Sequence, residues 1–390
     1  MSRFHSYINS AKTIIDQYKG QEPLAVYLKQ FFAANKKYGS KDRKQIGSLC
    51  YHYYRVAKAL NFTEKEDQLL AATLLCENQF SNLLQDLKPE WNGIISKDLS
   101  EKKSVLKDDF DENKLFSFTE ELNDGIDAKA FALSFLHQPN FFIRLRPGHE
   151  EIVIAKLKAL AVPFEQITNN CLALPNGTKL DEEIQIDKEV VVQDYNSQQV
   201  GEVVKPFFTI SNTPLTVWDC CAASGGKSIM LYDIDCKIRF TVSDIRSSIL
   251  HNLQNRFQRA GLQHYQSFVA NLASEEAHLS ANQKFNIVVA DVPCTGSGTW
   301  ARTPEQLYFF NQHSITEFTL RQQKITAHII PHIANGGYLI YITCSVFIKE
   351  NEAMSDYIVQ NFGLQLMEQK LLKGYDRFAD SMFVAIFRKI

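Results

Sequence analysis

The chain has 390 residues, more than one ordinary domain needs, so two or three domains are expected. Hydrophobic residues make up 45% of it and charged residues 22%, values typical of a soluble globular protein. The net charge of −2 excludes a strongly basic field over the whole molecule, so any role in nucleic-acid binding requires a local basic patch.

Eight cysteines occur without regular spacing and without a C-x-x-C pair. The start of the chain has no apolar segment of the kind found in signal peptides, and no apolar run approaches the length that spans a bilayer. We therefore expect free thiols in a reducing cytoplasm, with no metal site and no membrane partner.

Residues 1–137 are predicted to form an all-α domain. Apolar side chains recur at helical spacing over 7–18, 24–32 and 46–54, and Ser40 is expected to cap the third of these helices.

The pattern then changes twice. Segment 97–127 carries several like charges close together, which predicts a solvated connection because like-charged runs rarely pack. Residues 141–148 alternate and then turn, as a strand does, and two short strand candidates follow at 171–174 and 189–193. A small α+β module of the RRM-like kind is expected over 138–205.

From 206 to 390, strands alternate with helical stretches. The predicted strands are 215–220, 239–243, 266–270, 285–290, 337–343 and 382–388. This alternation predicts an α/β fold with a doubly wound, mostly parallel sheet. Ligands of such folds bind at the carboxyl ends of the strands, so the residues after each strand are the candidate site.

Small residues and paired glycines follow the first of these strands. The segment 219–228 reads D-C-C-A-A-S-G-G-K-S, which fits neither the phosphate-binding loop nor the usual dinucleotide fingerprint. By itself it is equally consistent with a tight strand-to-helix turn. Asp244 ends the next strand, where an acid in nucleotide-binding folds hydrogen-bonds ribose hydroxyls, and the two features together favour a cofactor site.

Polar residues also end the third, fourth and fifth strands. Asn271 follows the third, where its amide could bond an adenine edge or merely cap a turn, and Asp291 closes the fourth. Cys294 and Cys344 lie in turn-forming segments after the fourth and fifth strands. Inert, buried cysteines are the usual case, but these positions favour two thiols that face one pocket, at least one of them a nucleophile.

These motifs resemble those of the RsmB-type (Fmu/Sun) family of RNA 5-methylcytosine methyltransferases, which use S-adenosylmethionine. The family's C-A-A-P-G-G-K loop corresponds to C-A-A-S-G-G-K at 221–227 and its D-x-P-C-S-x-x-G motif to 291–298. Its T-C-S motif corresponds to 343–345, and the E-N-E triplet that tends to follow it to 350–352.

The resemblance covers roughly residues 140–390 and implies a class I, Rossmann-like methyltransferase domain over 206–390. The first 137 residues more loosely resemble the NusB-like, RNA-binding helical domain that family members often carry in front. The family pattern implies that S-adenosylmethionine is bound by Cys221, Ala222, Ala223, Ser224, Gly225, Gly226, Lys227, Asp244, Asn271 and Asp291.

The same resemblance assigns the catalytic roles. Cys344 is the nucleophile that adds to carbon 6 of cytosine, Cys294 acts in product release, and Asp291 holds ring nitrogen 3. Two positions depart from the pattern. Ser224 replaces a proline, which costs rigidity in the loop, and Asn271 stands where an aspartate is usual.

The expected partner is ribosomal RNA with a splayed-out cytosine, bound by a monomeric enzyme. Two basic clusters could contact its phosphates or could be ordinary solvated faces: Lys36, Lys37, Lys41, Arg43 and Lys44, and Arg144 with Arg146. The alternatives are a methyltransferase of transfer RNA, of a protein or of a small molecule, and a non-catalytic RNA-binding factor in ribosome assembly.

Overall fold

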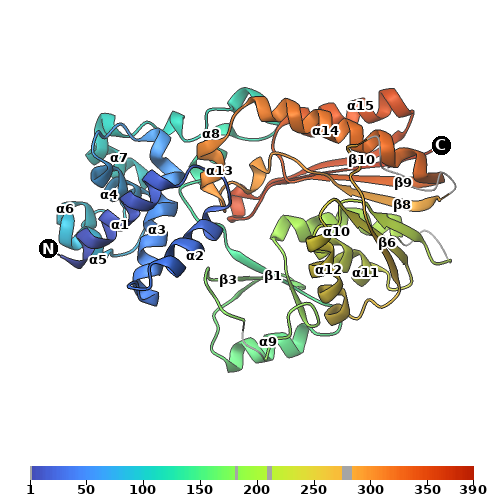
Figure 1. Ribbon diagram of the computed structural model, residues 1–390, viewed down its shortest axis with the longest axis horizontal. Coiled ribbons are helices and arrows are strands. Elements are labelled where there is room, and N and C mark those ends of the chain that lie inside the picture. Colours follow the sequence, from blue (N-terminus) through green and yellow to red (C-terminus); the bar gives the residue numbers. More distant parts are fainter. Residues whose placement is uncertain (1, 181–182, 209–212, 275–282) are drawn as a thin grey trace. The chain divides into compact units, whose positions relative to one another are not determined.

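A computed structural model of the chain describes residues 2–180, 183–208, 213–274 and 283–390 (Figure 1). The chain divides into two compact units. The helical unit comprises Met1–Glu120, Asp127–Gln138 and Thr299–Gln312, and the sheet unit comprises Glu121–Ile126, Pro139–Gly298 and His313–Ile390. No helix in the described ranges is long and apolar enough to cross a membrane. The predicted division into three domains stays a prediction.

The helical unit confirms the helical prediction for the start of the chain. Its α-helices are α1 (Arg3–Gln17), α2 (Leu24–Ala34), α3 (Ser40–Val56), α4 (Lys65–Cys76), α5 (Asn82–Leu87), α6 (Pro89–Asn92), α7 (Leu99–Leu106), α8 (Ala128–Ser134) and α13 (Pro304–Phe309). The apolar faces read from the sequence are buried in its core, with Ile8, Ile14 and Leu49 at 0–1% exposure.

Two expectations for this unit are wrong. The N-cap of α3 is Gly39, whose backbone N–H donates to the Asp42 carboxylate at 2.8 Å, and Ser40 is the first helical residue. Segment 97–127 packs into structure, with α7 and three short 3₁₀ helices. Several of its charged side chains have partners within the fold. Lys103 pairs with Glu112 at 2.9 Å, and the ammonium group of the buried Lys102 donates to the Glu77 carbonyl at 2.7 Å.

The sheet unit begins with a four-stranded antiparallel sheet, in the order β2-β3-β1-β4. Its elements are β1 (Phe141–Leu145), α9 (Glu150–Ala159), β2 (Glu165–Thr168), β3 (Cys171–Leu174) and β4 (Val190–Val192). The strand candidates at 171–174 and 189–193 are confirmed, whereas β2 was not predicted.

The second basic cluster, Arg144 and Arg146, lies on or directly after β1 and is buried. Both guanidinium groups pair with Asp233 at 2.7 Å, and Arg146 also donates to the Ala260 carbonyl. A buried, paired arginine neither reaches a phosphate in solvent nor forms a solvated face, so both possibilities left open by the sequence for this cluster are wrong.

A seven-stranded sheet forms the rest of the unit, in the order β10-β11-β9-β8-β5-β6-β7. Its strands are β5 (Thr216–Asp219), β6 (Arg239–Asp244), β7 (Tyr265–Val269), β8 (Phe285–Asp291), β9 (Ile333–Thr343), β10 (Gln365–Leu372) and β11 (Met382–Arg388). β5 to β9 pair in parallel, and β11 is antiparallel to both its neighbours. The doubly wound, mostly parallel sheet is confirmed.

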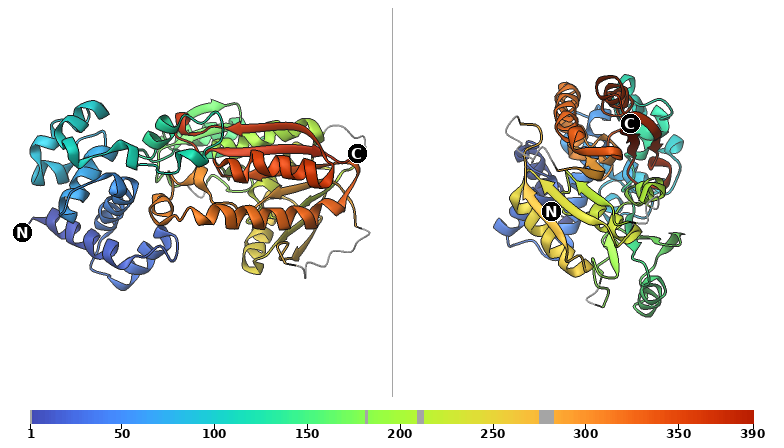
Figure 2. Two further views of the ribbon diagram at one scale, coloured as in Figure 1. Left: turned by 90° about the horizontal axis from the view of Figure 1, so that it is seen from above. Right: turned by 90° about the vertical axis from the view of Figure 1, so that its right-hand side faces the viewer.

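Helices cover both faces of this sheet (Figures 1 and 2). α10 (Tyr195–Phe208), α11 (Gly226–Ile234) and α12 (Ser247–Ala260) bury one face, and α14 (His313–Ile329) and α15 (Glu352–Phe362) bury the other. Successive residues of each strand point to opposite cores, as Val217 and Trp218 of β5 do. The order reverses between β5 and β8, and the carboxyl ends of these strands are where such folds bind ligands.

Candidate active site

The small-residue loop between β5 and α11 is folded tightly against the sheet. The Ala222 N–H donates to the Ser243 carbonyl of β6 at 2.9 Å. Gly225 has φ +81°, and a Cβ there would lie 2.7 Å from the Phe257 ring of α12, so a larger residue is excluded on both grounds. The loop therefore needs glycine where α11 begins, as a close backbone approach requires.

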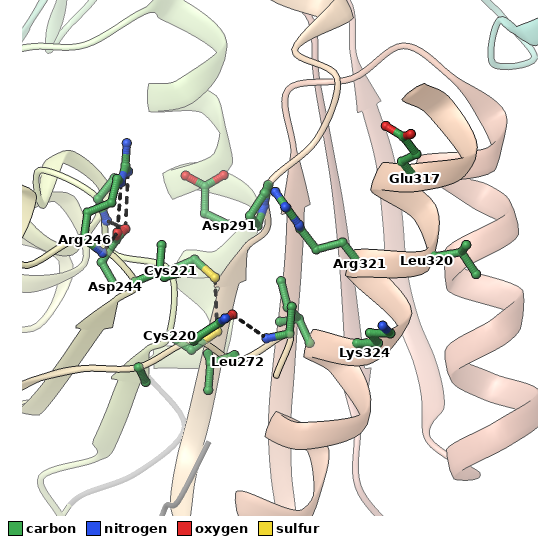
Figure 3. Close-up of a pocket in the computed structure, with 17 residues that line it drawn as sticks. Cys220, Cys221, Asp244, Arg246, Leu272, Asp291, Glu317, Leu320, Arg321 and Lys324 are labelled. Carbon is green, nitrogen blue, oxygen red and sulfur yellow. Dashed lines mark hydrogen bonds and ion pairs between the residues drawn. The ribbon is translucent and has the colours of Figure 1, made fainter. Parts of the chain in front are cut away.

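Asp244 connects this loop to β6. One carboxylate oxygen accepts the Ala223 N–H at 3.1 Å, and the other accepts the Arg246 N–H at 2.9 Å. Asp244 is 6% exposed and lines a cleft of about 800 Å³ in front of the loop (Figure 3). An acid at this edge, next to the loop, is suitably placed to receive hydroxyl groups of a ligand.

The cleft is formed by the ends of β5 to β8 and by one face of α14. Its lining includes five of the predicted cofactor residues: Cys221, Ala223, Asp244, Asn271 and Asp291. The lining residues that the sequence did not single out include Ile245, Arg246, Leu272, Pro293, Arg321 and Lys324. In Figure 3, Arg321 extends from α14 toward the Asp291 side of the cleft.

Asn271 caps a turn, one of the two roles left open by the sequence, and its contact with adenine stays a prediction. Its side-chain oxygen caps a turn by accepting the Ala273 N–H at 3.2 Å, and the residue also lines the cleft. Because the side-chain oxygen of Asn271 is used in the turn, its NH₂ group remains to donate a hydrogen bond to a ligand.

Lys227, at the start of α11, forms an ion pair with Asp291 at the end of β8, with 2.7 Å between Nζ and Oδ2. Burial by itself would lower the pKa of Lys227, but attraction to Asp291, with a smaller contribution from Cys344, raises the pKa above its ordinary value. The site therefore holds a permanent ammonium group beside the carboxylate at neutral pH.

Cys294 and Cys344, fifty residues apart, come together. Their Sγ atoms are 3.4 Å apart, and both thiols are free and partly buried. The hydrogen bond with Cys344, together with burial, raises the pKa of the Cys294 thiol well above its ordinary value. Among the described residues that line the cleft neither cysteine appears, but Asp291 and Pro293 of the Cys294 segment do.

A buried polar network holds the two cysteine segments in register. The Glu350 carboxylate accepts hydrogen bonds from the hydroxyls of Thr295 and Ser345, each at 2.5 Å, and from the Thr295 N–H at 2.9 Å. The Gln322 side chain of α14 donates to Glu350 and to the Pro293 carbonyl, each at 3.0 Å. Burial raises the pKa of Glu350. The sequence presented Glu350 only as part of a triplet, and its contact with both segments depends on the fold.

Two further contacts support the cofactor loop. Arg256 of α12 donates to the Ser224 carbonyl at 3.1 Å and to its hydroxyl at 3.0 Å, and the same guanidinium pairs with buried Asp187 at 2.8 Å. Asp219, at the end of β5, accepts the Ser228 hydroxyl at 2.6 Å, and burial raises the pKa of Asp219 to about 7. No local sequence signal marks Arg256 or Asp187, which are far from the loop in sequence.

The chain is similar in sequence to known ribosomal RNA methyltransferases. Residues 211–377 match the family model for the 16S rRNA methyltransferases RsmB/F. Ribosomal RNA small subunit methyltransferase B of Photorhabdus laumondii is 26% identical over 162 residues, 42% of this chain and 36% of its own. The Proteus mirabilis protein of that name is 27% identical over 203 residues, 51% and 46% of the two chains. The chain thus matches less than half the length of these curated relatives.

Three solved structures share the fold. The crystal structure of PH0851 has a TM-score of 0.70 at 16% identity and covers 99% of this chain and 98% of that one. A methyltransferase homolog protein from Pyrococcus horikoshii has a TM-score of 0.57 at 18% identity, over 69% and 92% of the two chains. NSun6 from Pyrococcus horikoshii, solved with SFG, has a TM-score of 0.55 at 14% identity, over 67% and 95%.

The seven-stranded sheet and its helices therefore have the fold of a class I S-adenosylmethionine-dependent methyltransferase. The glycine loop, the acid at the end of β6 and the two cysteine segments lie at the carboxyl edge where that fold binds its ligands. The family model covers the strands that carry all of these segments. Over residues 211–377, the part of the chain that carries these segments, the protein is therefore similar to the RsmB-type (Fmu/Sun) methyltransferases.

Proposed function

We propose that this protein is an S-adenosylmethionine-dependent RNA cytosine-5 methyltransferase that acts on ribosomal RNA. The observation that carries the proposal is the 3.4 Å approach of Cys294 and Cys344 next to the Lys227–Asp291 ion pair. A methyltransferase of proteins or small molecules has no use for two adjacent thiols at two strand ends. The relatives are named as ribosomal RNA methyltransferases, which favours ribosomal over transfer RNA.

The residues of the cleft fit S-adenosylmethionine. The volume of about 800 Å³ suits a ligand of nucleoside size with an amino-acid arm. Asp244 would hold the ribose hydroxyls and Asn271 the adenine edge, with the loop at 221–226 beside them. When bound, the cofactor supplies a methyl group on a sulfonium centre.

The proposed chemistry starts at Cys344. Its thiolate adds to carbon 6 of cytosine, which makes carbon 5 electron-rich enough to attack the methyl group. The Asp291 carboxylate, held by Lys227, would accept a hydrogen bond from protonated ring nitrogen 3 and stabilise the positive charge there.

Release then requires transfer of the proton on carbon 5 to a water molecule, while the bond from carbon 6 to sulfur breaks and Cys344 leaves as a thiolate. Cys294 is proposed to act in this step. Because its raised pKa keeps it protonated at neutral pH, it can donate a hydrogen bond to the leaving thiolate at the observed separation. The cytosine must be unstacked to be approached at carbon 6, so loop or single-stranded RNA is the proposed substrate, acted on by a cytoplasmic monomer.

The test compares three cysteine variants with RNA and S-adenosylmethionine. Cys344→Ala should lose methylation and form no adduct, whereas Cys294→Ala should accumulate a protein–RNA adduct that survives denaturing electrophoresis. Cys236→Ala, at an exposed cysteine outside the site, is the matched control and should behave as wild type. Unchanged methylation by Cys344→Ala would overturn the mechanism. Bisulfite sequencing of RNA from a deletion strain would identify the modified cytosine.

A further inference from the structure

Positive charge is concentrated at one end of the chain. The first 60 residues contain 11 Lys and Arg against 3 Asp and Glu, a net charge of +8, whereas the other 330 contain 31 against 41, a net charge of −10. The overall charge of −2 therefore conceals a basic segment, which makes up α1, α2 and α3 of the helical unit (Figure 1). Segregation of this kind is typical of a surface that binds a polyanion.

A polar cleft of about 620 Å³ lies in this basic segment. One wall is a stripe along α1, where Asn9, Thr13 and Gln17 recur every four residues and are exposed. Amide and hydroxyl groups in such a row can donate to and accept from the edges of nucleobases. A polar stripe by itself is also what an ordinary solvated helix face shows. The residues of the opposite wall therefore decide between such a face and a surface that binds nucleobases.

The opposite wall is aromatic. The rings of Phe31 and Tyr38 are nearly parallel, with an angle of 25° and a centroid distance of 6.3 Å, and both residues are partly exposed. Tyr38 is fixed in place, because its hydroxyl lies 3.0 Å from Ser10 Oγ and its carbonyl accepts the Arg43 Nε–H at 2.8 Å. A rigid aromatic face opposite a polar stripe is the combination that stacks and reads unpaired bases.

Cations border the aromatic wall. Lys37 Nζ lies 5.1 Å from the centre of the Tyr38 ring, and Lys41 and Lys44 continue along the exposed side of α3. These side chains can neutralise the phosphates on either side of a nucleotide that is stacked in the cleft.

We propose that the cleft between α1 and the end of α2 binds unpaired nucleotides of RNA, with Phe31 and Tyr38 stacking the bases and Lys37, Lys41 and Lys44 contacting the phosphates. The proposal rests on RNA being the substrate, as proposed above. It adds a second site, in a unit that carries none of the catalytic residues, and assigns to it the capture of flanking single-stranded RNA.

The test uses the full chain and a fluorescein-labelled, unstructured 12-nucleotide RNA, with anisotropy read at several KCl concentrations. Tyr38→Leu, which keeps an apolar side chain but removes the stacking face, should weaken binding by about 10-fold. Tyr38→Phe keeps the ring and should stay within about twofold of wild type, because the stacking face is retained.

The phosphate contacts are tested by charge. A triple variant with Gln at Lys37, Lys41 and Lys44 should lower the slope of log affinity against log salt concentration by about 2. Each phosphate contact of a single strand contributes about 0.7 to that slope. The matched control changes Lys97, Lys114 and Lys129 to Gln, three exposed lysines elsewhere in the helical unit, and should leave the slope unchanged.

A measurement on the unmodified chain avoids any dependence on variant folding. Ultraviolet crosslinking to RNA with 4-thiouridine should give adducts within residues 30–41. Equal losses from the two lysine triplets, or unchanged affinity in Tyr38→Leu with crosslinks elsewhere, would overturn the proposal and leave the basic face to an acidic protein. No RNA binding by wild type at any salt concentration would instead overturn the proposed function itself.

Discussion

The guanidinium group of Arg256 donates one hydrogen bond to the carbonyl and one to the hydroxyl of Ser224. Ser224 occupies the loop position at which the family pattern has a proline, whose ring would fix the backbone. Here the loop is instead tied to α12 and, through Arg256, to buried Asp187. A covalent constraint in the family loop is replaced by a hydrogen-bonded one.

This relationship predicts the effect of removing Arg256. Arg256→Gln should weaken S-adenosylmethionine binding by about 10-fold, since hydrogen bonds from a charged group contribute about 1.5–3 kcal/mol. Adding Ser224→Pro to this variant should recover most of the lost affinity, because the proline ring fixes the backbone of the loop again. Calorimetric titration would check both. Arg259→Gln, which removes another partner of Asp187 that does not touch Ser224, is the control and should bind normally. If the double variant binds S-adenosylmethionine no more tightly than Arg256→Gln, the hydrogen bonds of Arg256 do not take the place of the proline.

Asn271 offers a gain-of-affinity test. Asn271→Asp should tighten S-adenosylmethionine binding by about threefold to tenfold, because one oxygen can keep the turn at Ala273 while the other accepts from the adenine amino group. Asn271→Ala, which loses the turn contact as well, should bind more weakly than wild type. Titration calorimetry on the three proteins gives the order, and an Asp variant that binds less tightly than Asn would exclude adenine from this part of the cleft.

The Glu350 network predicts a stability effect. Glu350→Ala removes the carboxylate that accepts from the buried hydroxyls of Thr295 and Ser345, and should lower the free energy of unfolding by about 2–4 kcal/mol. Glu350→Gln should cost less, because one side-chain oxygen remains. Urea unfolding measures both effects, with exposed Glu368→Ala as a control expected within about 0.5 kcal/mol of wild type. Faster thiol labelling of Cys294 and Cys344 in Glu350→Ala would show that the network positions these segments.

Asp219 predicts a pH dependence of stability. Burial raises its pKa from the ordinary 3.8 to about 7, so the folded state binds this proton more tightly than the unfolded state. Its contribution is full below about pH 4 and is lost as the pH rises through 7. Asp219→Asn cannot ionise, so its free energy of unfolding should fall less between pH 5 and pH 8 than that of wild type. Exposed Asp356→Asn should show the wild-type difference, and identical slopes for all three proteins would refute the assignment.

The sequence predicted the strands that are buried on both faces, because runs such as Ile287–Ala290 leave few other structures possible. It did not predict β10, whose residues are mostly exposed at the sheet edge and include polar ones, so that strand has no buried apolar run to reveal it. The sequence also predicted that Cys294 and Cys344 lie close together. Each follows a strand, and in this fold class the carboxyl ends of parallel strands meet at one edge of the sheet.

The contacts of charged residues could not be read from the sequence. Arg144 and Arg146 look like a surface patch in the sequence, and only the position of Asp233 on α11 shows that they are buried and paired. Glu350 likewise contacts Thr295, 55 positions away, and Arg256 contacts Ser224, 32 positions away. A local sequence pattern indicates whether a segment is a helix or a strand. It does not indicate which distant residues its charged side chains will contact.

The helical unit takes Thr299–Gln312 from a part of the chain that otherwise builds the sheet unit. Trp300 is fully buried within it against Phe116 and Phe118, and Glu305 accepts the Leu24 N–H at the start of α2. During synthesis this unit therefore cannot complete its core until the ribosome has passed residue 312, after β5 to β8 have already emerged. A fragment ending near residue 138 would lack Thr299–Gln312 and so part of the core of the helical unit. Cleavage of the chain at one position therefore cannot separate the two units. For the same reason, a single recombination event could not have joined them in their present form.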